Sequence, residues 1–218
     1  PPARHPEPAR QEMKRIYAFD FDGTLTDKDT LPAFIRFAKG GIRMAAGFLY
    51  FSPLIVLMKL HLYPNWKVKQ QVFSWFFKGM EAGVFDRLCL AFARQNPQLL
   101  RPEGVATVKR ILGEPETAVV VISASIDNWV RPFFDGFGGK VQVLGTQIEV
   151  ADGLLTGRFT SRNCYGQEKV NRLTALYPHR KDYRLTAFGD SRGDRELLAY
   201  ADRGFYKPFR NGETECGK

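Results

Sequence analysis

The sequence predicts an α/β fold built on an open, doubly wound parallel sheet. Short apolar β-type runs at 16–19, 118–122 and 185–188 each end in small polar residues, as buried parallel strands often do. Amphipathic helical patterns fall between and after these runs, so strand and helix alternate along the chain. In a sheet of this kind the functional residues gather at the carboxyl ends of the strands.

Each element of this fold has its own local pattern. Residues 1–12 are rich in Pro and charge and hold no large apolar side chain, so we expect a disordered leader before the first strand. A hairpin is expected from 145–150 and 154–159, which alternate about an Asp-Gly turn. Helices are expected where apolar residues recur at helical spacing, at 103–112, 168–176 and 195–201.

Composition limits the possible partners. The 218 residues are 44% hydrophobic, enough for one ordinary domain or a core with a modest insert. The net charge of +9 points to anionic partners such as nucleic acid, phosphorylated metabolites or an acidic membrane face. Three scattered cysteines, Cys89, Cys164 and Cys216, make neither a disulfide framework nor a zinc motif, which favours a reducing cytoplasm.

The stretch 32–99 differs from the rest and is predicted to be a helical, aromatic insert. Between Ala33 and Met80 it contains seven basic residues and no Asp or Glu. The uncharged run 44–58 is shorter than the roughly 20 residues that span a bilayer and is interrupted by Ser52-Pro53. Two readings stay open: a buried helical hairpin kinked at Pro53, or an amphipathic face resting on anionic lipid with Tyr63 and Trp66 at the interface.

Asp20 and Asp22 lie two places apart at the end of the first apolar run. Two like charges repel there, and burial raises the pKa of a carboxyl group, so the pair makes sense if a cation keeps one ionised while the other transfers protons. A calcium loop of the EF-hand type would need Gly and Glu where Leu25 and Leu31 stand. The sequence also contains no phosphate-binding G-x-x-x-x-G-K-[ST] loop.

The string D-x-D-G-T-L-T at 20–26 resembles motif I of the haloacid-dehalogenase-like hydrolases, most of which are magnesium-dependent phosphatases with an aspartate nucleophile. Three further elements occur in the order that this family expects: Ser123, Lys169 and the string FGDSRGD at 188–194. The resemblance implies a Rossmann-like, doubly wound parallel sheet with a helical cap inserted after the first strand. The catalytic core would be 13–31 and 100–218, and the cap 32–99.

The resemblance also implies residue roles. Asp20 would attack phosphorus and form an aspartyl-phosphate, and Asp22 would act as the general acid and base. Phosphoryl oxygens would be held by Thr24, Ser123 and Lys169. Mg²⁺ would be bound by Asp20, the backbone carbonyl of Asp22, Asp190 and Asp194.

The cap position is similar to that of the phosphoserine-phosphatase-like branch of the family. Members of that branch carry a Glu nine places after the nucleophile and an Arg in the cap for the substrate's amine and carboxylate; Asp29 and Phe73 stand at those places here. The basic, apolar cap and the string NCYGQEKVNRL at 163–173 are also similar to bacterial relatives around phosphatidylglycerophosphatase C.

These likenesses imply a phosphorylated small molecule or a phospholipid head group as substrate. They also imply a cytoplasmic protein that touches the inner face of an anionic membrane peripherally. Phosphoserine phosphatase activity is one alternative. Another is a catalytically silent protein of this fold that binds nucleic acid or protein through its basic cap. The presence of all the residue types that the catalytic chemistry requires argues against this second alternative.

Overall fold

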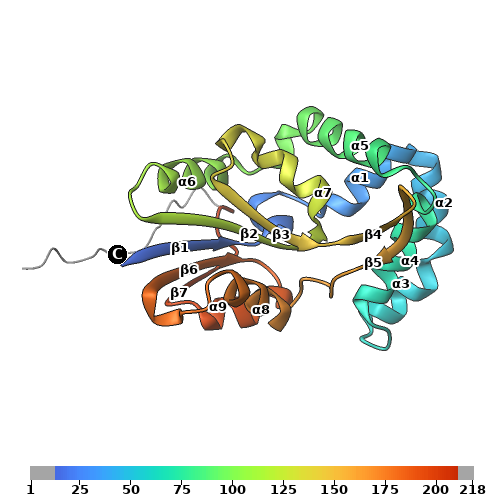
Figure 1. Cartoon of the computed structure of the whole chain (residues 1–218). Coiled ribbons are helices and arrows are strands. Elements are labelled where there is room, and N and C mark those ends of the chain that lie inside the picture. The colour runs from blue at the N-terminus through green and yellow to red at the C-terminus, as the bar shows by residue number, and fades with distance from the viewer. Residues whose placement is uncertain (1–12, 211–218) are drawn as a thin grey trace, which may run out of the picture.

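The computed structural model of the chain describes residues 13–210, and a five-stranded parallel sheet lies at its centre (Figure 1). The strand order is β3-β2-β1-β6-β7, which confirms the predicted doubly wound α/β fold. The strands are β1 Lys14–Phe19, β2 Thr117–Ile126, β3 Val141–Thr146, β6 Tyr183–Gly189 and β7 Arg203–Tyr206. The predicted leader at 1–12 lies outside the described residues.

Both faces of the sheet are buried because each central strand is apolar on both sides. Along β2, Val119 and Val121 belong to one hydrophobic cluster, and Val120 and Ile122 belong to a second. This alternation is the two-residue period of a strand buried between helices. Helix α6 (Pro102–Leu112) lies on one side of the sheet, and α8 (Gln167–Leu176) and α9 (Arg195–Tyr200) lie on the other (Figure 1).

Five of the helices between β1 and β2 lie beside the carboxyl ends of the strands, over most of the range where the insert 32–99 is expected (Figure 1). They are α1 Thr30–Lys39, α2 Gly41–Tyr50, α3 Ser52–Lys59, α4 Asn65–Phe77 and α5 Ala82–Gln95. Short helical segments connect the other elements: Phe21–Leu25, Pro97–Leu99, the short helix α7 Asp127–Val130, Arg131–Phe137, Arg180–Asp182 and Arg192–Asp194. We call helices α1–α5 the cap.

A two-stranded hairpin from the second half of the chain joins the cap. Its strands are β4 Ile148–Ala151 and β5 Leu154–Phe159, so the predicted strand 145–150 is divided between β3 and β4. The Leu155 N–H donates to the Met80 carbonyl at 2.8 Å, and the Leu155 carbonyl accepts from Gly79 N–H at 2.8 Å. The hairpin therefore attaches the residues that follow α4 to the second half of the chain.

Aromatic packing connects the cap to the sheet. Phe34 of α1 is fully buried and stacks on Trp129 of α7 with ring centroids 4.9 Å apart. The Trp129 indole N–H donates to the Thr30 hydroxyl at 3.2 Å. Because one hydrophobic cluster contains Phe34 and Trp129 together with Phe19 and Val121 of the sheet, the cap and the core share an interior.

The reading of 44–58 as a buried helical hairpin is wrong. Only Gly47 is buried in α2, and no residue of α3 is buried. Several large apolar side chains of this segment face outward, among them Leu49 (76% exposed), Tyr50 (70%) and Val56 (54%), although Phe51 between the two helices is buried. The flanking Ile42 (89%), Leu60 (61%) and Leu62 (72%) are exposed as well. Within residues 13–210 no single helix is both long enough and apolar enough to cross a membrane. Helices α2 and α3 reach the required length and hydropathy only when they are taken together, and a bend of 61° separates them.

Candidate active site

The parallel register of the sheet brings distant parts of the sequence to one edge. Phe19, the last residue of β1, aligns with Val121 of β2 and Phe188 of β6. The Asp20 N–H continues this ladder by donating to the Phe188 carbonyl at 2.8 Å. Asp20, Ser123 and Asp190 follow those aligned positions closely in the sequence, so they lie near one another at the carboxyl ends of the strands.

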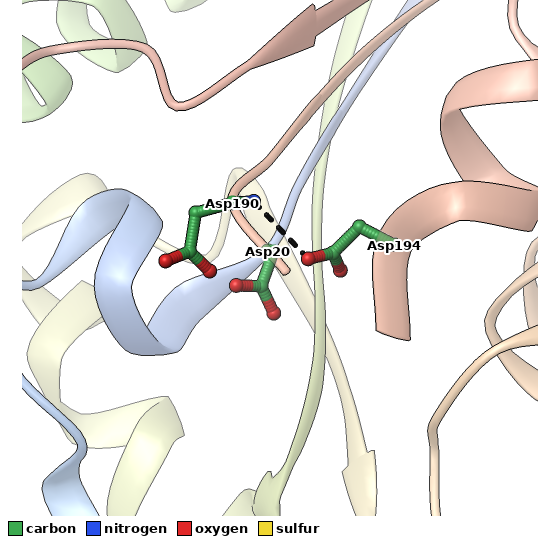
Figure 2. Close-up of side chains that lie close together, drawn as sticks. All are labelled: Asp20, Asp190 and Asp194. Atoms are coloured by element: carbon green, nitrogen blue, oxygen red, sulfur yellow. Dashed lines mark hydrogen bonds between the residues drawn. The ribbon is translucent and has the colours of Figure 1, made fainter. Parts of the chain in front are cut away.

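Three carboxyl groups form a compact cluster there (Figure 2). Oxygens of Asp20, Asp190 and Asp194 lie within 4.8 Å of one another. Lys169 from α8 lies among them, and its Nζ donates to Asp20 Oδ1 at 2.5 Å and to Asp194 Oδ1 at 2.6 Å. The lysine is 2% exposed, so this ammonium group is screened little by water and pairs strongly with both carboxylates.

Burial and charge shift the proton affinities of this cluster in opposite directions. Burial raises the pKa of Asp20 to about 7, against the lowering effect of the Lys169 charge. Burial would lower the pKa of Lys169, but the Asp20 and Asp194 carboxylates outweigh it and raise that pKa above its usual value. Burial, together with the nearby charge of Asp194, raises the pKa of Asp190. A cation at Asp20 and Asp190 would favour their ionised forms.

Asp194 is held firmly by the loop that contains it. Its Oδ2 accepts hydrogen bonds from the Asp190 N–H (3.1 Å), the Ser191 N–H (3.0 Å) and the Ser191 hydroxyl (2.8 Å). Burial acts to raise the pKa of Asp194, but Lys169 and Ser191 hold it below its ordinary value. Since both oxygens already have partners, Asp194 shapes the 190–194 loop and positions Lys169 whatever else it binds.

Asp22 is surrounded by hydroxyl groups rather than by cations. Its Oδ1 accepts from the Thr30 N–H at 2.7 Å and the Thr30 hydroxyl at 2.6 Å. Its Oδ2 accepts from the Ser125 hydroxyl at 2.5 Å, and the Ser123 hydroxyl lies at 3.4 Å. These contacts fix the Asp22 carboxyl group beside the cluster and orient it, as a proton-transfer group requires.

Gly23 makes the close approach of two loops possible. Its φ is +81°, a left-handed conformation that glycine adopts without strain. A Cβ at this position would collide with the Asp190 carboxyl group. Arg210 closes the same corner, because its guanidinium donates to Asp190 Oδ2 at 2.6 Å.

The donor set fits a magnesium ion. Asp20 and Asp190 offer carboxylate oxygens, which are hard ligands of the kind that Mg²⁺ prefers, within the 4.8 Å cluster. The predicted contribution of Asp22 is its backbone carbonyl, in keeping with a carboxylate already held by Thr30 and Ser125. Asp194 is the third carboxylate of the cluster, and it would hold such an ion together with Asp20 and Asp190.

The other predicted site residues lie at varying distances from this cluster. Thr24 is fully buried and its hydroxyl donates to Asp20 Oδ2 at 3.1 Å, so it orients Asp20. Asp29 caps α1 by accepting from the Leu31 N–H at 2.9 Å, and it lines a cavity over the carboxylate cluster that is described below. Burial and the nearby Asp22 charge raise the pKa of Asp29.

Phe73 is not brought to the site. It is fully buried, and its ring packs against Phe77 and Phe85 in the cap and Phe159 in the hairpin. The position that holds an Arg in the phosphoserine branch is therefore a packing position here. Counting along the sequence to the matching position could not reveal that Phe73 is buried, because the orientation of helix α4 decides which of its residues face the site.

A cavity of about 300 Å³ lies over the carboxylate cluster, and the cap lines one side of it. Asn65 and Lys69 of α4 and Tyr165 from the loop before α8 line it, and sequence reasoning missed all three as site residues. Lys69 Nζ also donates to the Ala124 carbonyl at 3.0 Å, between the two serines near Asp22. No local motif marks these three positions. Ser125 was missed as well, but it could have been found, because residues two places apart on a strand face the same side and Ser125 follows Ser123 on β2.

The sequence is similar to those of known proteins. The model of the haloacid dehalogenase-like hydrolase family matches residues 17–199. Protein CicA of Caulobacter vibrioides is 37% identical over 164 residues, which cover 74% of this chain and 72% of that protein.

Solved structures share the fold at low sequence identity. A protein of unknown function from Bordetella pertussis Tohama I has a TM-score of 0.75 at 20% identity, covering 88% of this chain and 89% of its own. A substrate-bound phosphoserine phosphatase has a TM-score of 0.62 at 16% identity, covering 90% and 87%.

Proposed function

Because the chain belongs to the haloacid dehalogenase-like hydrolase family, we propose that it is a magnesium-dependent phosphomonoester hydrolase acting through an aspartyl-phosphate on Asp20. One observation carries this proposal. The buried Lys169 ammonium and the Asp20, Asp190 and Asp194 carboxyl groups lie together below a cavity that the cap lines on one side. This set provides a nucleophile, a cation for phosphoryl oxygens and oxygen ligands for a metal.

In the first step, an oxygen of Asp20 attacks phosphorus and the ester oxygen leaves. Lys169 offsets the repulsion between the carboxylate and the anionic phosphate. Ser123, whose hydroxyl lies 3.4 Å from Asp22 Oδ2, would add a hydroxyl donor. Protonated Asp22 transfers its proton to the leaving oxygen, from a position that Thr30 and Ser125 fix. In the second step, Asp22 removes a proton from water, which attacks the phosphorylated Asp20 and releases phosphate.

Magnesium, when bound by Asp20, Asp190 and the Asp22 carbonyl, supplies positive charge to the phosphoryl oxygens in both steps. Asp194 supports this arrangement because it accepts hydrogen bonds from the Asp190 backbone N–H and from the Lys169 ammonium group. The substrate class that fits is a small organic phosphate or the head-group phosphate of a phospholipid. The cap residues Asn65 and Lys69 line the cavity together with Asp29. We expect these three side chains to contact the leaving group of the substrate.

Phosphoserine phosphatase activity is the second candidate, favoured by the shared fold. Asp29 could receive a substrate amine, since it lines the cavity. Lys69 is the cap residue that could offer a cation for the substrate's carboxylate. Against this candidate, Phe73, at the place where that branch carries an Arg, is fully buried and does not line the cavity. A silent binding protein is disfavoured, because such a protein would have no need for a buried lysine among three carboxyl groups.

Peripheral contact with an anionic membrane belongs to the same proposal. Exposed apolar side chains of α2 and α3 stand among basic residues such as Arg43 and Lys59, with no Asp or Glu from Ala33 to Met80. We expect the protein to sediment with phosphatidylglycerol vesicles more than with phosphatidylcholine vesicles, and the double variant L49D/L60D to lose that preference. Equal sedimentation with both vesicle types would remove the membrane part of the proposal.

The phosphatase proposal is tested with an aryl phosphate and a series of magnesium concentrations. Asp20→Asn should abolish magnesium-dependent phosphate release, because an amide is a poor nucleophile. Asp190→Asn should raise the magnesium concentration needed for half-maximal rate. Asp182→Asn is the matched control, since Asp182 is exposed and lies in the turn before β6. Unchanged turnover in Asp20→Asn would refute the assigned nucleophile.

A further inference from the structure

A second cavity adjoins the catalytic one. It has a volume of about 460 Å³ and lies between the α3–α4 connection and the loop before α8. Asn65 and Tyr165 line both this cavity and the one over Asp20 and Lys169. The two cavities are therefore neighbours that share a boundary of two side chains, and neither Asn65 nor Tyr165 is needed for the phosphoryl chemistry described above.

The lining of the second cavity is mainly apolar. Met58, Leu62, Tyr63 and Pro64 contribute to it, whereas the first cavity is lined mostly by charged and polar groups. A phosphate with a short polar substituent has no use for such a surface. An alkyl chain on the leaving group would displace water from it, and apolar burial is favourable in proportion to the area covered.

The position of the second cavity in the fold indicates what enters it. Met58 and Leu62 lie at the end of the outward-facing apolar segment of α2 and α3, where Leu60 is 61% exposed and Leu57 is 38% exposed. The apolar surface thus runs from the outside of the cap to the boundary of the catalytic cavity. A second copy of this chain is a poor occupant, since it would bring together two segments that each carry seven basic residues and no acidic one.

We propose that the second cavity is a subsite for an apolar chain on the substrate's leaving group, so that the preferred substrates are amphiphilic phosphate monoesters. This inference rests on the proposed phosphatase function and names its substrate class. The phosphate lies at Asp20 and Lys169, the leaving group passes Asn65 and Tyr165, and the chain lies along Met58, Leu62 and Tyr63. Arg192, whose guanidinium lies beside His61 of this cavity, attracts an anionic amphiphile.

A contact at the rim connects the subsite to the catalytic loop. Arg192, in the loop between Asp190 and Asp194, lies with its Nη1 3.1 Å from Nε2 of His61, which lines the second cavity. Because the same loop holds Asp190 and Asp194, the rim of the subsite and the carboxylate cluster are fixed to one segment. A chain bound in the subsite is consequently held at a defined position relative to the reacting atoms.

The test is a series of linear alkyl phosphates, from methyl to octyl, each kept below its critical micelle concentration. The initial rate of phosphate release gives kcat/KM for each ester. We expect kcat/KM to rise by roughly two- to fourfold for each methylene that enters the subsite. Met58→Asn should flatten this slope, and Val56→Asn should keep it, because Val56 lies on the same helix, is 54% exposed and does not line the cavity.

A second arm separates dissolved amphiphiles from lipids in a bilayer. Phosphatidic acid in phosphatidylglycerol vesicles serves as the probe, with the same two variants. Rates that depend on Met58 in both arms support the subsite. A dependence on Met58 that appears only with vesicles would overturn the subsite and assign the effect to surface binding alone.

Two further results distinguish this inference from the function on which it rests. A flat chain-length profile, or a slope that Met58→Asn leaves intact, overturns the subsite while aryl phosphate turnover upholds the phosphatase. The absence of turnover with every ester refutes the phosphatase, and the subsite with it.

Discussion

At the scale of single residues, the hydroxyl groups around Asp22 distinguish its role from that of Asp20. Asp20 is paired with a lysine, whereas Asp22 receives hydrogen bonds from Thr30 and Ser125. A lysine next to Asp22 would favour its ionised form and so oppose the protonated form that donates a proton. Neutral donors orient the carboxyl group and still allow it to carry a proton in one step and lose it in the next.

Ser125→Ala should therefore slow catalysis without removing the nucleophile. The lost hydrogen bond to Asp22 is 2.5 Å long, and hydrogen bonds to charged groups contribute about 1.5–3 kcal/mol, so we expect kcat to fall by roughly ten- to a hundredfold. Steady-state kinetics on an aryl phosphate measure this effect. In an Asp22→Asn background the Ser125→Ala substitution should have little further effect. Equal losses in both backgrounds would mean that Ser125 acts independently of Asp22.

At the scale of elements, helix α4 serves the cap and the active site together. Phe73 and Phe77 are buried in the aromatic cluster, while Asn65 and Lys69, near its start, line the catalytic cavity. The hairpin β4–β5 holds the other end of the helix through Met80 and Leu155. Lys69 then connects α4 to the end of β2 through the Ala124 carbonyl at 3.0 Å.

Lys69→Met should weaken substrate binding more than chemistry. The ammonium group lies in the cavity and adds positive charge opposite Asp29, so its removal should raise KM by roughly tenfold for an anionic substrate and change kcat less. Lys67→Met is the matched control, because Lys67 is exposed and its ammonium lies near the Tyr63 and Trp66 rings. If the two variants raise KM equally, general surface charge explains the effect and Lys69 has no special position.

At the scale of the whole molecule, the cap and the sheet share one hydrophobic cluster. Phe34 lies at the junction, where its ring contacts Trp129 on the core side and Phe77, Phe85 and Phe92 within the cap. A shared interior couples the two parts energetically, so we expect them to unfold in one transition.

Phe34→Ala should lower the free energy of unfolding by about 3–5 kcal/mol, because it opens a cavity in a fully buried aromatic cluster. Urea denaturation followed by tryptophan fluorescence and by far-ultraviolet circular dichroism gives the value. Leu49→Ala, at a side chain that is 76% exposed, should change stability little. Two separate transitions in the wild-type protein would contradict the coupling.

The sequence was most informative where the local pattern is simple. The strands at 16–19, 118–122 and 185–188 are uninterrupted apolar runs, and their order and polar ends predicted the fold that the structure has. Strand β7 at Arg203–Tyr206 was missed because four residues at a sheet edge carry almost no pattern. The exposure of α2 and α3 was also not predictable, since an apolar helix looks the same in sequence whether its apolar side faces a core or the outside.

The candidate site divides in the same way. Sequence reasoning could name the residues that stand in strings that follow a strand or begin a helix: Asp20, Asp22, Ser123, Lys169 and Asp190. Their catalytic roles stay predictions. Asn65, Lys69 and Tyr165 reach the cavity only because of how the cap and the loop before α8 fold. Phe73 illustrates the reverse case, in which an aligned position is turned into the packed interior.

The nucleophilic role of Asp20 is tested most directly by trapping the enzyme during turnover. The protein is mixed with an aryl phosphate and magnesium, quenched in acid within the first turnover, digested and examined by mass spectrometry. We predict a phosphoryl group on the peptide that contains Asp20, absent in Asp20→Asn and prolonged in Asp22→Asn. A phosphoryl group on another residue, or full turnover by Asp20→Asn, would contradict the proposed mechanism.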